Sequence, residues 1–304
     1  MVRVLARSRN LQNLSRKRLE FLTPLAFLSP ALIGLILFRI VPIVVALFGS
    51  LYSFKLIGKA RHFVGLSNFE RLFGDPLFWR SLINTVVFVL GVTSIQVCIS
   101  LGLAILLTRN IRGVVFFRTL IFVPVVLSMV VASATWKLAF DSNAGLFNSV
   151  LGAMGLPRQP FLTSPDQALP AVMTMVVWKG VGYWMVILIA GIKAIPEVFY
   201  EAARVDGASS WQRFWKITLP LLLRPLAFVI VADTAINLLL FAPVYLMTQG
   251  GPSDSSNVLM YMTYNTAFAQ GRMGYAAAIA VVLLIISSLV ILLQLRSLRS
   301  DLSY

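Results

Sequence analysis

Six long apolar runs, separated by shorter polar segments, make up most of this chain. They lie at roughly 25–54, 81–107, 119–140, 170–192, 225–247 and 274–294. About 20 consecutive apolar residues are enough to cross a bilayer as an α-helix. The pattern therefore predicts an all-α integral membrane protein. Its six transmembrane helices form one domain, 25–294, between a basic N-terminal segment, 1–24, and a tail, 295–304.

Two details refine the predicted helices. The first run is longer than the apolar core of a signal peptide and shows no small-residue cleavage site, so we expect a retained membrane helix. Prolines lie inside three of the runs, where neighbouring groups can satisfy the freed carbonyls, and they predict kinks. These prolines are Pro30, Pro42, Pro124 and Pro243.

Composition and charge support a membrane protein and indicate its orientation. The 304 residues are 59% hydrophobic and 12% charged, against about 25% charged in an ordinary globular domain. The net charge of +15 does not indicate nucleic-acid binding, because Lys and Arg cluster between the apolar runs. Sixteen of them fall in 1–24, 108–118, 193–224 and 295–304, and seven in 55–80, 141–169 and 248–273. The positive-inside rule therefore predicts that both termini are cytoplasmic.

One polar insert, 196–220, separates the fourth and fifth runs. Pro196 suits the start of a short helix, and Gly207 suits its end, where a residue with positive φ closes the turn. Ser209 and Gln212 have the spacing of a capping box for a second helix. This second helix would carry Trp211, Phe214, Trp215 and Thr218 on one face. The insert is therefore predicted to form a cytoplasmic helix–turn–helix.

The insert also carries the pattern E-A-A-x3-G-x9-I-x-L-P, from Glu201 to Pro220. It resembles the signature loop of the membrane subunits of binding-protein-dependent ABC importers. The likeness is to the carbohydrate and glycerol-phosphate branch, and to its first maltose-type permease subunit. Weaker similarities at 63–69, 117–124, 190–196 and 248–252 extend it over roughly residues 25–294.

This resemblance implies a permease subunit in the plasma (inner) membrane of a bacterium, forming half of a translocation pathway. It implies four kinds of partner: a second homologous permease, two ATP-binding subunits, an extracytoplasmic solute-binding protein and membrane lipid. ATP and Mg²⁺ would belong to the partner subunits, and this non-catalytic chain would bind no cofactor and no metal. The loop residues implied to contact the ATPase are Glu201, Ala202, Ala203, Asp206, Gly207, Ile217, Leu219 and Pro220.

The residues themselves argue against two other classes of protein, an ion-coupled secondary carrier and a membrane enzyme. There is no G-x-x-x-x-G-K-[ST] phosphate loop and no cluster with metal-ligand spacing. An ion-coupled secondary carrier, the alternative from another class, often uses intramembrane acid or histidine relays. Only Arg39, Lys137, Lys179 and Asp233 are charged within the apolar runs, which disfavours a self-contained carrier and a membrane enzyme.

The substrate is implied to be an oligosaccharide, with glycerol-3-phosphate or a glycerophosphodiester as the alternative. Helical rise places Lys179 and Asp233 at similar depth on consecutive antiparallel helices, so we expect them to pair. They would act either as a structural ion pair or as part of a polar patch on the solute path. The candidate pathway residues are Trp178, Lys179, Gly180, Tyr183, Asp233, Asn237 and Phe241.

Overall fold

The structure is a computed structural model that describes residues 24, 27–56, 61–109 and 112–297. The predicted segments 1–24 and 295–304 therefore lie largely outside the described residues. Within them the chain is helical apart from one short hairpin, in which β1 (Tyr52–Ser53) pairs antiparallel with β2 (His62–Phe63). The all-α prediction is confirmed.

The first long helix of the described chain is the apolar Phe27–Gly49, whose second half comprises η1 (Ile36–Ile40) and α2 (Val41–Gly49). After the hairpin come the short α3 (Ser67–Phe73) and the long α4 (Pro76–Thr108). Next are α5 (Val114–Val126), α6 (Met129–Ala139), α7 (Leu146–Ala153), η2 (Phe161–Thr163) and α8 (Ala168–Lys193).

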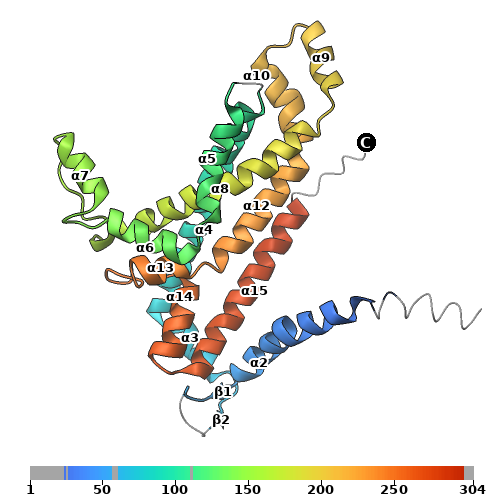
Figure 1. Cartoon of the computed structure of the whole chain (residues 1–304). Helices are drawn as coiled ribbons and strands as arrows, with labels where there is room; N and C mark the ends of the chain where they lie inside the picture. Colours follow the sequence, from blue (N-terminus) through green and yellow to red (C-terminus); the bar gives the residue numbers. More distant parts are fainter. Residues whose placement is uncertain (1–23, 25–26, 57–60, 110–111, 298–304) are drawn as a thin grey trace, which may run out of the picture.

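The insert comprises α9 (Glu197–Val205), α10 (Ser210–Arg213), η3 (Phe214–Thr218) and α11 (Leu219–Leu221). The C-terminal part contains α12 (Leu223–Leu238), α13 (Ala242–Met247), α14 (Leu259–Tyr264), η4 (Asn265–Ala269) and α15 (Met273–Ser297). Figure 1 shows α4, α8, α12 and α15 at the centre, with the insert at one end and the β hairpin at the other.

Four of the described helices are long and apolar enough to cross a membrane: Phe27–Gly49, Pro76–Thr108, Ala168–Lys193 and Met273–Ser297. The described chain reaches six spans if each of two bent helix pairs counts as one. One pair is α5 with α6, which meet at 98°, and the other is Ser210–Leu221 with α12, which meet at 65°. The two bends lie in or beside the third and fifth predicted runs.

The third run, expected as one kinked helix over 119–140, is broken into α5 and α6. Pro124 has no N–H to continue the helix, and the chain turns extended at Leu127 and Ser128. Ser128 then caps α6 by accepting a hydrogen bond from the Val131 N–H at 3.2 Å. The fifth run is also shorter than expected, because α12 ends at Leu238 and Pro243 lies near the start of a separate α13.

Buried polar side chains hold α4 against α8. The Nε2 atom of Gln96 donates to the Val176 carbonyl at 2.8 Å, and the Ser100 hydroxyl donates to the Val181 carbonyl at 3.0 Å. Helices in a membrane gain little from apolar contact alone, so such bonds and close packing fix their positions. Close packing is needed at Gly182, where a Cβ atom would lie 2.3 Å from the Ile121 carbonyl oxygen of α5.

The N-terminal helix Phe27–Gly49 stands apart from this core. None of its most apolar window is buried, and its C-terminal part packs against α15 near β1. In Figure 1 it runs away from the rest of the molecule. Most of this apolar helix therefore remains uncovered.

Candidate functional site: a cavity between the helices and an apolar surface on the insert

The first helix of the insert ends in a Schellman motif. Gly207 has φ +73°, the Ala208 N–H donates to the Ala203 carbonyl at 2.8 Å, and the Gly207 N–H donates to the Arg204 carbonyl at 3.1 Å. These two bonds satisfy carbonyls that the helix end leaves free. The positive φ predicted for Gly207 is confirmed.

The second helix begins with the predicted capping box. The Ser209 hydroxyl accepts from the Gln212 N–H at 3.3 Å, and the Gln212 side chain accepts from the Ser209 N–H at 2.8 Å. The two helices of the insert are tied together where the Tyr200 and Thr218 hydroxyls lie 3.0 Å apart. The insert is thus an ordered hairpin of helices.

The residues of the signature pattern divide between the surface and the base of the insert. Glu201, Ala202, Asp206 and Gly207 are exposed, and Ala203 is half-buried. Ile217, Leu219 and Pro220 are half-buried where the second helix meets the membrane helices. The first group is available to a partner, and the second group fixes the insert to the body of the protein.

Apolar side chains are exposed on the outer surface of the insert. Val205 is 88% exposed, Trp211 is 69% exposed, and Val198 and Trp215 are also exposed. The predicted common face of Trp211, Phe214, Trp215 and Thr218 is divided, since Thr218 is buried and Phe214 half-buried. A π-helical turn over Phe214–Thr218 changes the register at this point. Exposed apolar surface of this kind marks contact with another protein or a membrane.

A cavity of about 150 Å³, called here the membrane cavity, lies among α4, α5, α6, α8 and α12. Its polar lining comes from residues that are distant in the sequence. The lining includes Gln96, Lys179, Gly180, Tyr183, Trp184, Asp233 and Asn237. The structure thus brings five of the seven candidate pathway residues together.

The two charged groups of the cavity bind separate partners. The Lys179 ammonium donates to the carbonyls of Pro124, Val125 and Leu127 at 3.2, 3.2 and 2.7 Å. These carbonyls lie where the break between α5 and α6 interrupts the helical hydrogen bonding. Asp233 Oδ1 accepts from Trp184 Nε1 at 2.8 Å. The predicted Lys179–Asp233 ion pair is therefore wrong, because each charge finds another partner.

Two acceptor oxygens in the cavity are buried without a hydrogen-bond partner in the described part of the chain. They are Gln96 Oε1 and Asp233 Oδ2. A buried acceptor left unpaired costs about 1–3 kcal/mol. Both side chains line the cavity, but the two oxygens lie beneath its surface, so each side chain must turn before its oxygen can accept a hydrogen bond from a group in the cavity.

Gly180 makes the position of Gln96 possible. A Cβ atom at Gly180 would lie 2.0 Å from Gln96 Nε2, so a larger residue would displace the amide. Gln96 was not among the residues predicted from the sequence, although an uncharged amide in the middle of an apolar run was a signal that could have identified it.

The other two candidates do not line the cavity. Trp178 contacts the ring of Trp136, with 5.3 Å between centroids. Phe241 lies among the rings of Tyr245 and Tyr264, at 5.1 and 4.5 Å. Both side chains belong to aromatic clusters beside the cavity.

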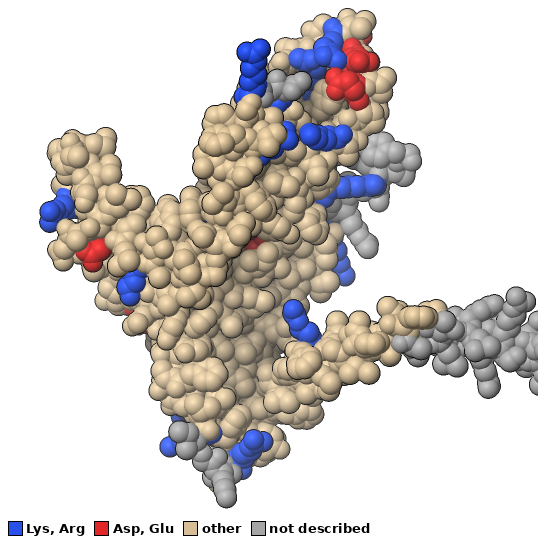
Figure 2. All heavy atoms as spheres, in the orientation of Figure 1, with Lys and Arg blue, Asp and Glu red and all other residues tan. Residues whose placement is uncertain are grey.

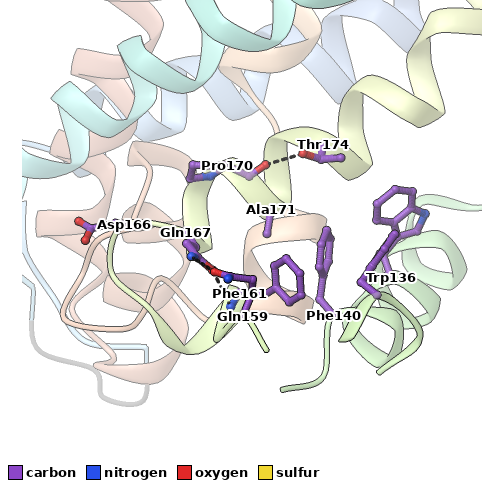
Figure 3. A pocket seen from close by; sticks show the side chains of 10 residues that line it. Trp136, Phe140, Gln159, Phe161, Asp166, Gln167, Pro170, Ala171 and Thr174 are labelled. Atoms are coloured by element: carbon purple, nitrogen blue, oxygen red, sulfur yellow. Dashed lines mark hydrogen bonds between the residues drawn. The ribbon is translucent and has the colours of Figure 1, made fainter. Parts of the chain in front are cut away.

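A second cavity, of about 350 Å³, lies between α6, α7, η2 and the start of α8. Its aromatic lining comprises Trp136, Phe140, Phe147 and Phe161. Figure 3 shows the rings of Trp136, Phe140 and Phe161 in a row, with the joined amides of Gln159 and Gln167 beside them. Phe140 and Phe161 are 5.0 Å apart, and the Gln167 amide donates to Gln159 at 2.9 Å. These mutual contacts secure the loop over 140–168 to α8.

A short turn in the same loop is fixed by a carboxylate. Asp141 accepts hydrogen bonds from the N–H groups of Ala144 at 2.8 Å and Asn143 at 2.9 Å. These two backbone donors, that of Ala144 first, lower the pKa of the exposed Asp141 carboxyl below its usual value.

Comparison with known proteins identifies the class of this arrangement. The family described as "Binding-protein-dependent transport system inner membrane component" matches residues 5–299. The chain is 34% identical to a lactose transport system permease of Rhizobium radiobacter, covering 90% of this chain and 93% of that one. It is 31% identical to an sn-glycerol-3-phosphate transport system permease of Agrobacterium fabrum, covering 92% and 96%.

A solved structure shows the same fold. A chain of a bacterial alginate ABC transporter, crystallised with an alginate pentasaccharide-bound periplasmic protein, superposes with a TM-score of 0.82. The two chains are 23% identical, and the match covers 93% of this chain and 95% of the other. The family match also argues against the alternative hypothesis that the chain is an ion-coupled secondary carrier. This multi-pass membrane protein therefore belongs to the family of inner-membrane components of binding-protein-dependent transport systems, as a permease subunit of an ABC importer.

Proposed function

We propose that this permease imports an oligosaccharide that an extracytoplasmic solute-binding protein delivers. It would form half of the pathway, with a second homologous permease as the other half and two ATP-binding subunits as the motor. ATP and Mg²⁺ would bind to those subunits, so this chain would have no catalytic step of its own. Both termini and the insert would lie in the cytoplasm.

The observation that carries the choice of substrate is the pair of unpaired acceptors in the membrane cavity, Gln96 Oε1 and Asp233 Oδ2. A sugar offers many hydroxyl donors, which would satisfy both atoms once the two side chains turn toward the cavity. The ring of Tyr183, partly exposed at the same cavity, offers an apolar surface for a sugar ring. Such a mixture of apolar surface and a few placed polar groups is typical of small-molecule sites.

Glycerol-3-phosphate is the second candidate, because the related permease of Agrobacterium fabrum is named for it and Lys179 supplies a cation. The arrangement favours a neutral sugar. The Lys179 ammonium already donates to three carbonyls, and the Asp233 carboxylate would repel a phosphate at the same cavity.

Two exposed surfaces support the proposed partners. The helix Phe27–Gly49 exposes apolar side chains along most of its length, which suits packing against a second permease within the membrane. The exposed apolar side chains of the insert suit a groove on an ATP-binding subunit, into which a short helix could dock.

The test is uptake by proteoliposomes that contain the complete complex and its binding protein. We expect uptake of a neutral oligosaccharide and none of glycerol-3-phosphate. Replacing Gln96 by Leu removes the Oε1 acceptor together with the bond to the Val176 carbonyl, and it should raise the KM or lower the kcat by about 2- to 10-fold for each hydrogen bond lost.

The matched control is Ser287→Ala, which removes a buried, unpaired hydroxyl that does not line the cavity. This control should transport normally. Uptake of glycerol-3-phosphate with no oligosaccharide uptake would overturn the substrate proposal. Equal effects of the two substitutions would remove Gln96 from the solute path.

A further inference from the structure

A large basic cleft lies behind the insert, on the side away from the exposed apolar surface. It has a volume of about 840 Å³ and is bounded by the end of α4, the end of α8 and the inner sides of α9, α10 and η3. Figure 2 shows Lys and Arg side chains gathered over this end of the molecule. The membrane cavity and its residues are not part of this cleft.

The cleft carries an excess of positive charge. Four cations line it, Arg109, Lys193, Arg204 and Arg213, against the single carboxylate of Glu197. The Glu197 carboxylate is already engaged by Arg204 at 3.0 Å. Three positive charges therefore face the cleft without a carboxylate to balance them.

Two of these cations, Arg109 and Lys193, are free to bind a ligand, and a third is already engaged. Arg213 donates to the Ser210 hydroxyl at 3.1 Å. Arg109 and Lys193 make no hydrogen bond or ion pair to any residue that the structure describes. They come from the ends of two different membrane helices, so the fold itself brings them to one cleft.

The remaining lining indicates what kind of anion fits. The cleft wall continues into apolar side chains of the membrane helices, namely Ile105, Ile192 and Ile195. Since α4 ends at Thr108 and α8 at Lys193, the cleft lies where the spans leave the apolar layer. Basic pockets between membrane helices at this level bind the headgroups of anionic lipids. The Ser210 hydroxyl, which accepts a hydrogen bond from Arg213, still has its own O–H to donate to a phosphate oxygen.

We propose that this cleft binds the phosphate headgroup of an anionic phospholipid, with the acyl chains lying along the apolar ends of α4 and α8. The proposal rests on the cytoplasmic placement of the insert given under Proposed function, and it is independent of the transported solute. Lipid in the cleft would brace the inner side of the insert against the two helix ends.

An acidic surface of the ATP-binding subunit is a weaker candidate for the same cleft. On α9, Glu197, Tyr200 and Arg204 recur at helical spacing and face the cleft. Val198 and Val205 lie about a quarter turn or more away and are exposed. The insert thus has a separate surface for a protein partner, and the cleft opens between membrane helices.

The experiment is a lipid titration of the purified full chain, followed by native mass spectrometry. Dioleoyl-phosphatidylglycerol is the anionic probe, dioleoyl-phosphatidylcholine the zwitterionic one, and inorganic phosphate the soluble one. The test variant is Arg109→Gln with Lys193→Gln. The matched control is Arg112→Gln with Lys216→Gln, which removes two exposed cations from the same end of the molecule but outside the cleft lining.

We expect one tightly held phosphatidylglycerol, and a loss of about 25-fold in its affinity in the test variant. Each cation near an anionic headgroup contributes about 5-fold. The control should lose less than about 3-fold at this tight site. Both variants change side chains at the protein surface, and an unchanged thermal unfolding temperature would verify that each is folded.

Three outcomes would overturn the proposal. Equal losses in the two variants would mean that the whole basic surface attracts the lipid and the cleft does not. Equal binding of phosphatidylcholine would remove the anionic requirement. Displacement of the lipid by inorganic phosphate at the same affinity would assign the cleft to a soluble anion. Failure of oligosaccharide uptake would leave all three measurements unaffected, so the two proposals can fail separately.

Discussion

Replacing Gly207 by Val should open the turn between the two helices of the insert. Gly207 has φ +73°, a conformation that costs an L-residue about 1–2 kcal/mol and a β-branched residue more. A Cβ atom there would meet no other atom within 4 Å. The expected destabilisation is therefore backbone strain alone, and close packing cannot account for the glycine.

The strain should weaken the hydrogen bond from the Ala208 N–H to the Ala203 carbonyl, which closes the turn. A penalty of about 1–2 kcal/mol corresponds to about a 5- to 30-fold larger population of the open turn. Exchange of the Ala208 amide with deuterium should accelerate by that factor if it proceeds through this local opening. Gly207→Asn should change the exchange rate much less, because Asn tolerates positive φ.

Hydrogen exchange of the full chain in nanodiscs, followed by mass spectrometry, measures the opening of this turn directly. An amide in the middle of α8, such as that of Met185, serves as the internal reference and should not change. ATP-dependent uptake by the complex should follow the same order, with Gly207→Asn above Gly207→Val. The same exchange rate in the two variants would refute the strain argument.

Three further substitutions test other parts of the structure. Glu201→Lys should uncouple ATP hydrolysis from uptake while the complex still assembles, because this exposed carboxylate lies on the proposed docking helix; normal uptake in reconstituted liposomes would contradict this. The charge swap Lys179→Asp with Asp233→Lys should fail to restore the thermal stability lost in either single variant, since the two charges bind different partners; recovery to the wild-type unfolding temperature would reinstate the ion pair. Gly274→Ala should lower that temperature, because its Cβ atom would lie 1.9 Å from the Tyr52 carbonyl oxygen; an unchanged temperature would mean that the β hairpin shifts freely.

Much of the fold could be predicted from hydropathy because a bilayer imposes a simple length requirement on each helix. The insert was also predictable in detail. Its caps depend on residues within a few positions of one another, such as Ser209 with Gln212, and on the conformational freedom of Gly207. Local interactions of this kind are visible in sequence spacing.

The breaks in the helices were harder to predict. Pro124 indicated a kink, yet the structure has a 98° bend with a new helix start at Ser128. The cost of such a break depends on whether other groups satisfy the freed carbonyls. Here Lys179, more than fifty residues away, donates to three of them. No local pattern around Pro124 contains that information.

The same lysine explains why the predicted ion pair failed and what the cavity can do. Depth along the helices placed Lys179 near Asp233, but depth does not fix the direction in which a side chain points. Because the ammonium is bound by the α5–α6 bend, the Asp233 carboxylate is left with the Trp184 indole and one unpaired oxygen. That oxygen and Gln96 Oε1 are two buried acceptors beside the cavity for which the described residues supply no hydrogen-bond donor. The engagement of Lys179 by the bend thus satisfies the carbonyls freed at the break and leaves the Asp233 carboxylate without an ion pair.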